Sequence, residues 1–445
     1  MITNMTEGSP SKILWKFSIP MLISVIFQQL YNIVDSIIAG QFISVDALAA
    51  VGASYPITMI FLAIATGSNI GCSVVISQLF GGKNYAKVKT AIGTSVISIL
   101  FLSSLLTILG LFFCNDLMKL LHTPSDIFSD SALYLRIYIL SLIFIFLYNI
   151  CNGIFTALGD SKTPLYFLII SSVFNMILAL ILVILFHLGV AGVAWATFIA
   201  QGLSSVLASL ALIRRLKNIP TTEAFPLFSY NMLFKISRIA IPSILQQSFI
   251  SVGNLFIQGL INSYGSTIIA GYSAAIKLNT FAITSFSTLS SALSSFTAQN
   301  IGAGKLERIK KGFHAGILML LCIVLPLSIS FFLCSPTLIH IFVDSSNTPV
   351  VQSGTLFLQI VSPFYLIISI KLLADGVLRG AGAMVPFMIS TFSDLILRVI
   401  LSFVLSNYFG SMGIWISWPI GWTTAAILSC SFYYTGIWKK GANFN

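Results

Sequence analysis

Four polar residues in the first long apolar stretch of the chain share one helical face. They are spaced i, i+3, i+4 and i+7, and they are Gln28, Tyr31, Asn32 and Asp35. Asp35 is the only charged residue between Phe17 and Val45. A run this long and apolar predicts a membrane-spanning helix, in which a lone carboxylate is typical of an ion or proton site. The alternative is a hydrogen-bonded structural residue between helices.

The composition is that of a membrane protein with many spans. Of the 445 residues, 57% are hydrophobic and only 8% are charged, whereas soluble domains carry about 25% charged residues. The six cysteines are scattered singly, which predicts neither a disulfide framework nor a zinc site. The four histidines are dispersed, so an enzyme is not expected, and no GxxxxGK[ST] motif indicates ATP binding. We expect no cofactor beyond a coupling ion, H⁺ or Na⁺.

Apolar runs between polar or Gly/Pro breaks predict an all-α integral membrane protein with twelve transmembrane helices. In the first half the runs are about 16–43, 52–78, 91–113, 131–157, 165–187 and 191–213. In the second half they are about 236–262, 271–298, 312–334, 351–378, 387–409 and 412–436.

The basic residues are distributed unequally between the two sets of loops. Of the 23 Lys and Arg residues, 18 fall in the termini and in the loops that share their side. The positive-inside rule therefore predicts cytoplasmic termini for a multi-pass protein of the plasma (cytoplasmic) membrane. The same asymmetry explains the net charge of +11, so a nucleic-acid partner is not expected.

The chain repeats itself at a spacing of about 221 residues. Residues 78–87 are echoed by 299–308, and residues 153–159 by 376–382. Pro20 in the first span is echoed by Pro242 in the seventh. Both copies start on the same side, so the repeat is parallel and predicts two six-helix lobes related by a pseudo-twofold axis along the membrane normal. The predicted lobes are 1–213 and 236–445, joined by a cytoplasmic linker at 214–235.

With these repeats, with Pro20 and Asp35, and with the segment Leu378-Arg-Gly-Ala-Gly382, the chain resembles the multidrug and toxin extrusion (MATE) family. It is most similar to the bacterial branch that has an Asp in the first helix. The resemblance implies an exporter of organic, often cationic and amphipathic compounds, driven by inward flow of Na⁺ or H⁺. The expected partners are small-molecule drugs and organic cations, the coupling ion and membrane lipid, and we expect a monomer.

The resemblance also implies a coupling site in the first lobe. Its members here are Asp35, Tyr31, Asn149, Asn152, Asn175 and Thr197. A carboxylate with amide and hydroxyl oxygens is a donor set suited to Na⁺, which Asp35, Asn175 and Thr197 could hold. Members of this branch usually carry a second acid four residues after the span-five Asn, where this chain has Ala179. The choice between Na⁺ and H⁺ therefore stays open.

A charge network is predicted in the second lobe. Its residues are Lys277, Lys371, Asp375, Asp394 and Arg398. Two pairs, Lys371–Asp375 and Asp394–Arg398, are spaced i, i+4 and can close as intrahelical salt bridges. These charges either satisfy each other structurally or form a second protonation site or a gate. Beside Lys277, where the family tends to use an acid, this chain has Asn279.

The substrate path is predicted to lie in a central cleft between two rocking lobes. Candidate cleft residues are Gln28, Gln247, Asn254 and Met176. The alternative function is a flippase for lipid-linked glycans or lipids of related architecture. Such a protein needs several Arg or Lys residues in its cavity to hold phosphates, and few cationic residues occur within these spans.

Overall fold

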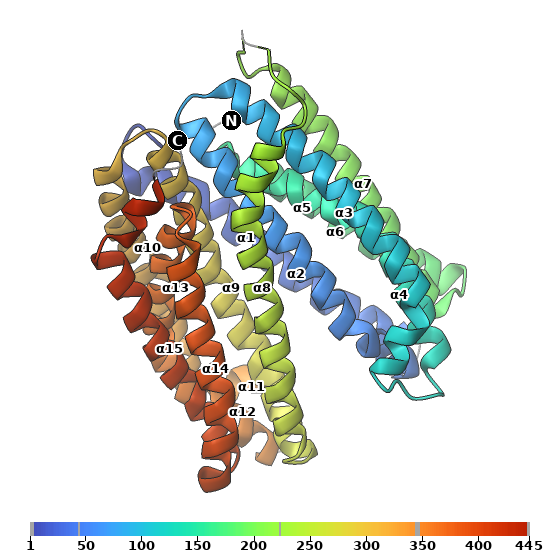
Figure 1. Ribbon diagram of the computed structural model, residues 1–445. Helices are drawn as coiled ribbons and strands as arrows, with labels where there is room; N and C mark the ends of the chain where they lie inside the picture. The colour runs from blue at the N-terminus through green and yellow to red at the C-terminus, as the bar shows by residue number, and fades with distance from the viewer. Residues whose placement is uncertain (1–3, 43–44, 222–223, 343–347, 443–445) are drawn as a thin grey trace. The chain divides into compact units, whose positions relative to one another are not determined.

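The computed structural model describes residues 4–42, 45–221, 224–342 and 348–442, with side chains described except at 31–48 and 440–442. All regular structure in these residues is helical (Figure 1). The chain divides by its contacts into two compact units: unit 1 holds residues 1–4 and 23–248, and unit 2 holds residues 5–22 and 249–445. The division runs through two helices rather than between helices, so the predicted lobe boundaries stay predictions.

Those two helices are α1 (Pro10–Phe42) and α8 (Tyr230–Asn262). The first part of α1, up to Leu22, belongs to unit 2, and its remainder belongs to unit 1. In α8 the order is reversed, since residues up to Ser248 belong to unit 1 and the rest to unit 2. Each helix contains one proline near this change of unit, Pro20 in α1 and Pro242 in α8.

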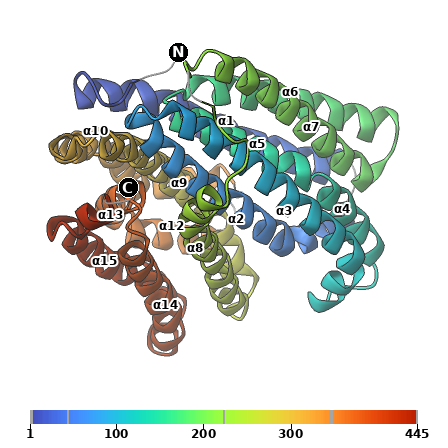
Figure 2. The ribbon, with the colours of Figure 1, turned by 45° about the horizontal axis from the view of Figure 1, so that its top comes forward.

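Unit 1 is a bundle in which α2 packs against α3, α4 and α5, and α7 packs against α5 and α6 (Figure 2). Its elements are α2 (Val45–Gly81), α3 (Tyr85–Leu120), α4 (Phe128–Leu140), α5 (Leu142–Ala157), α6 (Lys162–Leu180), the π-helix η1 (Ile181–Leu185) and α7 (Gly189–Lys217). The predicted span 131–157 is bent, since α4 and α5 meet at an angle of 46°. Ser141 lies between them, and its hydroxyl donates to the Tyr138 carbonyl at 2.5 Å, a back-bond that commonly bends helices.

Unit 2 is centred on α9, which packs against α10, α12 and α13, while α14 and α15 lie along each other (Figure 1). Its elements are α9 (Ser266–Gly302), α10 (Leu306–Leu333), α11 (Ser335–His340), α12 (Thr348–Val361), the 3₁₀-helix η2 (Ser362–Phe364), α13 (Tyr365–Gly380), α14 (Met384–Phe409), α15 (Ser411–Tyr434) and η3 (Ile437–Ala442). The predicted span 351–378 is divided by η2, where Pro363 supplies no backbone N–H for a continuous helix.

Ten of the predicted spans are long and apolar enough to cross a membrane within the described residues, counting α4 and α5 as one span. The remaining two correspond to α9 and α15, with 37 and 24 residues. Helix α9 is rich in Ser and Thr and is buried along much of its length, so it needs less apolar surface than a lipid-facing helix. The all-α membrane fold is confirmed, and the count of twelve spans stays a prediction.

The two repeats share their turn geometry. After α2 the backbone turns through Lys83 (φ 57°), and after α9 through Gly304 (φ 69°). In each turn a backbone N–H bonds the carbonyl five residues earlier: Asn84 to Leu79 at 3.1 Å, and Lys305 to Asn300 at 2.8 Å. This is the Schellman pattern of a helix C-terminus. Helix α2 ends at Gly81 and helix α9 ends at Gly302, at equivalent places in the two repeats.

Candidate functional site

Helices α6 and α7 bring together two of the predicted coupling residues in unit 1. The Asn175 side-chain amide donates to Thr197 Oγ1 at 3.4 Å, and that hydroxyl donates to the Val193 carbonyl at 3.1 Å. Asn175 is only 3% exposed. Among the described residues its Oδ1 is buried without a hydrogen-bond partner. An orphaned buried acceptor costs about 1–3 kcal/mol, and this oxygen is available to a proton donor or a hard cation.

The backbone just beyond Asn175 is irregular. Helix α6 ends at Leu180 and continues as the π-helix η1. Single π-turns inside helices occur frequently at functional sites because they shift the side chains on one face. This turn could not be predicted, since its residues Ile-Leu-Val-Ile-Leu are uniformly apolar.

Ala179 lies in a purely apolar setting. It is fully buried and packs with Ala196, with Leu178, Leu180 and Leu182 beside them. No neighbour in this cluster substitutes for the second acid of the related branch. Tyr31 and Asp35 lie on α1 but outside the described side chains, so their part in the site stays a prediction.

Asn149 and Asn152 bond within their own helix, α5. The Asn149 amide donates to the Ile145 carbonyl at 2.8 Å, and Asn152 Oδ1 accepts from the Thr156 hydroxyl at 3.5 Å. Both side chains are half-buried. Neither is joined to the Asn175–Thr197 pair by a hydrogen bond among the described side chains.

Asn69 of α2 is a polar residue that the sequence interpretation missed, and it lies against Gly153, the residue after Asn152 on α5. A Cβ placed on Gly153 would lie 1.9 Å from Asn69 Oδ1, so the amide rests directly on the α5 backbone. Only a glycine permits this approach. Gly153 in the repeated segment was the available signal, because a repeated glycine marks a close contact, although it does not identify the partner.

The predicted charge network of unit 2 contains a compact buried cluster. Lys371 Nζ lies 2.7 Å from Asp375 Oδ2, and the two side chains are 5% and 3% exposed. Asp375 Oδ1 accepts hydrogen bonds from Ser390 Oγ at 3.2 Å and from Ser429 Oγ at 2.6 Å. Lys371 Nζ also donates to Thr391 Oγ1 at 3.4 Å. The cluster thereby joins α13, α14 and α15 with one positive and one negative charge.

The second i, i+4 pair is looser. Arg398 Nε and Asp394 Oδ1 are 4.0 Å apart, and neither atom has a hydrogen-bond partner in the part of the chain that the structure describes. The Arg398 guanidinium lies 4.4 Å from the centroid of the Trp418 ring. A cation over an indole face gains electrostatic attraction, most of all where water is excluded.

Lys277 and Asn279 stand apart from these clusters. Lys277 is exposed, and its ammonium lies 5.5 Å from the centroid of the Phe342 ring. Asn279 is buried, and its Oδ1 accepts a hydrogen bond from the Tyr365 hydroxyl at 3.1 Å. The five predicted residues therefore form separate groups rather than one network.

The four predicted cleft residues differ in exposure. Gln28 and Asn254 are exposed, while Met176 and Gln247 are half-buried. Met176 follows Asn175 directly on α6. The cleft itself stays a prediction.

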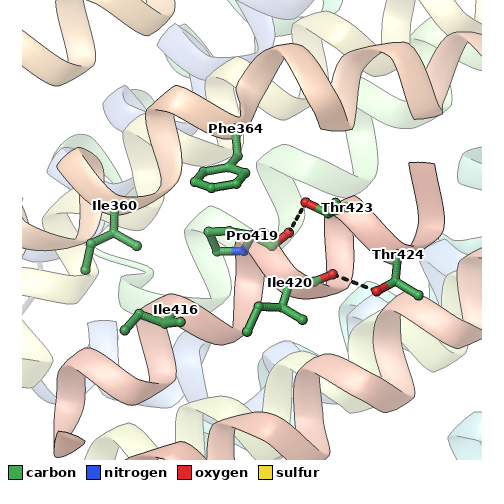
Figure 3. A pocket seen from close by; sticks show the side chains of 7 residues that line it. All are labelled: Ile360, Phe364, Ile416, Pro419, Ile420, Thr423 and Thr424. Carbon is green, nitrogen blue, oxygen red and sulfur yellow. Dashed lines mark hydrogen bonds between the residues drawn. The ribbon is translucent and has the colours of Figure 1, made fainter. Parts of the chain in front are cut away.

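An apolar pocket of about 430 Å³ opens between α12, η2 and α15 (Figure 3). It is lined by Ile360, Phe364, Ile416, Pro419, Ile420, Thr423 and Thr424. The two threonine hydroxyls donate to carbonyls of their own helix, at 2.7 and 3.0 Å. These bonds satisfy the hydroxyls within α15, so the pocket offers packing space rather than chemistry. In the described chain, no three His, Cys, Asp or Glu residues gather in a group that could hold a metal ion.

Comparison with known proteins gives a consistent result. A family model described as MatE matches residues 20–181 and 242–404. A probable multidrug resistance protein, YoeA of Bacillus subtilis, is 28% identical over 95% of this chain and 93% of its own. The multidrug export protein MepA of Staphylococcus saprophyticus is 24% identical over 96% of this chain and 94% of its own.

Among solved structures, the fold is similar to an outward-facing multidrug resistance MATE family transporter of the MOP superfamily. The TM-score is 0.91 at 23% identity, over 99% of this chain and 98% of that one.

Proposed function

The chain belongs to the MatE family, the multidrug and toxin extrusion transporters, as its sequence resemblance indicated, and on that premise we propose that it is a secondary active multidrug exporter. Its relatives point to a multi-pass membrane transporter rather than to an enzyme. The proposed substrates are organic, often cationic and amphipathic compounds, moved outward in exchange for H⁺ or Na⁺. The proposed form is a monomer in the cytoplasmic membrane with both termini inside.

The observation that carries the coupling proposal is the Oδ1 of Asn175, which has no hydrogen-bond partner among the described side chains. It is buried beside Thr197 in unit 1, the unit that also contains residues 23–42 of α1 and hence Asp35. A buried acceptor without a donor is stabilised when a protonated carboxyl or a cation arrives. In the proposed mechanism, Asp35 takes up the ion and Asn175 and Thr197 supply neutral oxygens around it.

The oxygen atoms of the proposed coupling site favour H⁺ over Na⁺ as the coupling ion. Sodium is a hard cation that prefers several oxygen ligands, as Ca²⁺ and Mg²⁺ do in proteins. The position of the second acid is Ala179, which packs among Ala196 and leucines. A single carboxylate can still be neutralised by one proton. Na⁺ is the alternative that the experiment below distinguishes.

Exchange follows from differential affinity. If the ion binds Asp35 more tightly in one state of the protein, its occupancy shifts the population toward that state. Substrate bound in a central cleft would shift the population the other way. Rocking of the two lobes about the cleft, as in other transporters built from parallel repeats, is the proposed motion.

The flippase alternative gains no support from the buried cations. Lys371 is paired with Asp375, and Arg398 lies beside Asp394 and Trp418. Cations already held by carboxylates are poorly placed to bind the phosphates of a lipid-linked glycan.

The test is efflux of ethidium from proteoliposomes given either a pH gradient or a Na⁺ gradient. Asp35→Asn is compared with Asp116→Asn, whose carboxylate is 69% exposed beside Lys119. We expect wild type and the control to export ethidium under the pH gradient, and Asp35→Asn to lose at least about tenfold in rate. Export driven by the Na⁺ gradient alone would assign Na⁺ instead. Normal export by Asp35→Asn would refute coupling through the first lobe.

A further inference from the structure

The segment that precedes α1 is buried on unit 2 rather than free. Met5 is fully buried and Thr6 is 4% exposed, whereas Glu7, Gly8 and Ser9 are exposed. Gly8 has φ 78°, a left-handed conformation that turns the chain into α1. A short segment that buries its backbone must find partners for its N–H and C=O groups.

Those partners come from the end of α9 and the turn into α10. The Met5 N–H donates to Gln299 Oε1 at 3.0 Å, and the Met5 carbonyl accepts from Asn300 Nδ2 at 3.2 Å and from Arg308 Nη2 at 3.3 Å. Lys305 Nζ donates to the Thr6 carbonyl at 2.9 Å. Arg308 Nη1 donates to the Gly8 carbonyl at 2.9 Å.

Arg308 is the central donor of this arrangement, which we call the latch (residues 5–8 with Gln299, Asn300, Lys305 and Arg308). Its guanidinium reaches two carbonyls of the segment and also donates through Nε to Asn300 Oδ1 at 3.0 Å. Among the described residues no carboxylate pairs with Lys305 or Arg308. A cation bonded only to neutral carbonyls is held less strongly than one in an ion pair, so these bonds can exchange for water when the segment leaves.

The corresponding segment before α8 is held in an analogous way by unit 1. The Ser229 N–H donates to Thr94 Oγ1 at 3.1 Å, and the Lys89 ammonium lies 5.3 Å from the Phe225 ring centroid. Both α1 and α8 therefore begin on one unit and continue in the other. In the attachment of α1, two cationic side chains, those of Lys305 and Arg308, donate hydrogen bonds directly to backbone carbonyls.

We propose that residues 5–8 form a releasable latch, closed in this structure by Arg308 and Lys305, which fixes the start of α1 to unit 2. Because the later part of α1 belongs to unit 1 and carries Asp35, a closed latch restrains the helix that connects the coupling residue to unit 2. Release of the latch accompanies the switch between transport states. This last statement rests on the proposed exporter function.

The experiment measures alkylation of single cysteines by N-ethylmaleimide, in a background in which the six natural cysteines are replaced by serine. Met5→Cys reports the buried segment, and Glu7→Cys, two residues away and exposed, is the matched reporter. At rest, we expect Met5→Cys to react at least about tenfold more slowly than Glu7→Cys. Arg308→Gln should raise the Met5→Cys rate about tenfold, because it removes two charge-assisted bonds to the segment.

Lys310→Gln is the control, since Lys310 is on the same helix but pairs only with the exposed Glu307 at 3.0 Å. It should leave the Met5→Cys rate within about twofold of its resting value. Equal rates for the two reporters at rest, or no effect of Arg308→Gln, would overturn the latch.

The last arm repeats the labelling in proteoliposomes that export ethidium under a gradient. We expect the Met5→Cys rate to rise severalfold during export while that of Glu7→Cys stays constant. If the Met5→Cys rate does not change during active export, residues 5–8 stay bound throughout transport, and the proposed release is wrong. If wild type exports no ethidium under either gradient, the proposed function fails and release fails with it, while the resting rates still decide whether the segment is latched.

Discussion

Lys371 and Asp375 form a salt bridge of 2.7 Å that is almost completely buried in unit 2. They are one helical turn apart on α13, and the carboxylate is further bonded by hydroxyls of Ser390 on α14 and Ser429 on α15. The pair therefore connects three helices. A buried pair of this kind is costly to break because the remaining partner keeps its charge without compensation.

Lys371→Met should destabilise the protein by about 3–5 kcal/mol, because it leaves the Asp375 carboxylate buried and unpaired. The double variant Lys371→Met/Asp375→Leu should recover most of that loss. The thermal unfolding midpoint in detergent measures both, with Lys310→Met as the exposed control. A Lys371→Met midpoint equal to the control's would contradict the prediction. Ethidium export by the folded double variant would show that the pair is structural, and its absence would favour the second protonation site or gate.

Asn175→Ala should slow ethidium export by about tenfold while changing stability by less than about 1 kcal/mol. The substitution removes an oxygen that has no donor among the described residues, and the 3.4 Å bond it loses is weak. The control is Asn115→Ala, which loses a 2.9 Å bond from Arg136 at the surface. Export and unfolding midpoint are measured on the same preparations. A stabilised Asn175→Ala that exports normally would mean that the oxygen has no role in coupling.

Gly376→Ala should be strongly destabilising, although alanine is the better helix former by about 1 kcal/mol. A Cβ at this position would lie 2.6 Å from the backbone carbonyl oxygen of Ser290 on α9, and a backbone atom cannot rotate away. The matched variant is Gly259→Ala in α8, where no atom lies within 4 Å of the added carbon. We expect opposite shifts of the unfolding midpoint for the two. Equal shifts would mean that α9 and α13 are not in close contact.

Asp160→Ala should destabilise the end of unit 1 where α6 begins and α7 ends by about 2 kcal/mol. The Asp160 carboxylate is 1% exposed, accepts from the Thr163 N–H at 3.2 Å and from its hydroxyl at 2.9 Å, and pairs with Arg215 at the end of α7. Trypsin cleavage after Lys162, at the start of α6, should accelerate. Asp130→Ala, at an exposed position in the first turn of α4, is the control. An unchanged cleavage pattern would show that the cap does not hold this end.

Much of the architecture could be predicted because its causes are local in the chain. Continuous apolar runs predict helices in a membrane, and the echo of residues 78–87 in 299–308 predicts a repeat whose turns indeed share their hydrogen bonds. The i, i+4 spacing of Lys371 and Asp375 predicts their contact, because neighbours on one helical turn meet in any helix. The family resemblance placed Asn175 and Thr197 in one predicted site, and the structure shows that they share a hydrogen bond.

Other features could not be predicted because their partners are remote in sequence. Nothing in the local sequence distinguishes Ser390, Thr391 and Ser429 from other serines and threonines in apolar helices. They contact Lys371 and Asp375 because α14 and α15 pack against α13. The bend at Ser141 depends on the hydrogen bond that its hydroxyl donates to the backbone carbonyl of Tyr138. The apolar sequence of η1 gives no sign of a π-turn.

The sequence by itself therefore determined the membrane class, the repeat, the family and the candidate residues, because hydrophobic length, periodicity and motif spacing are properties of neighbouring positions. The tertiary structure alone decided which of these residues meet. It placed Met5 against Gln299, 294 positions away, and it left the Asn175 oxygen without a donor among the described side chains. Such contacts depend on how whole helices pack, and the free energy of that packing is spread over many side chains rather than encoded in any one segment.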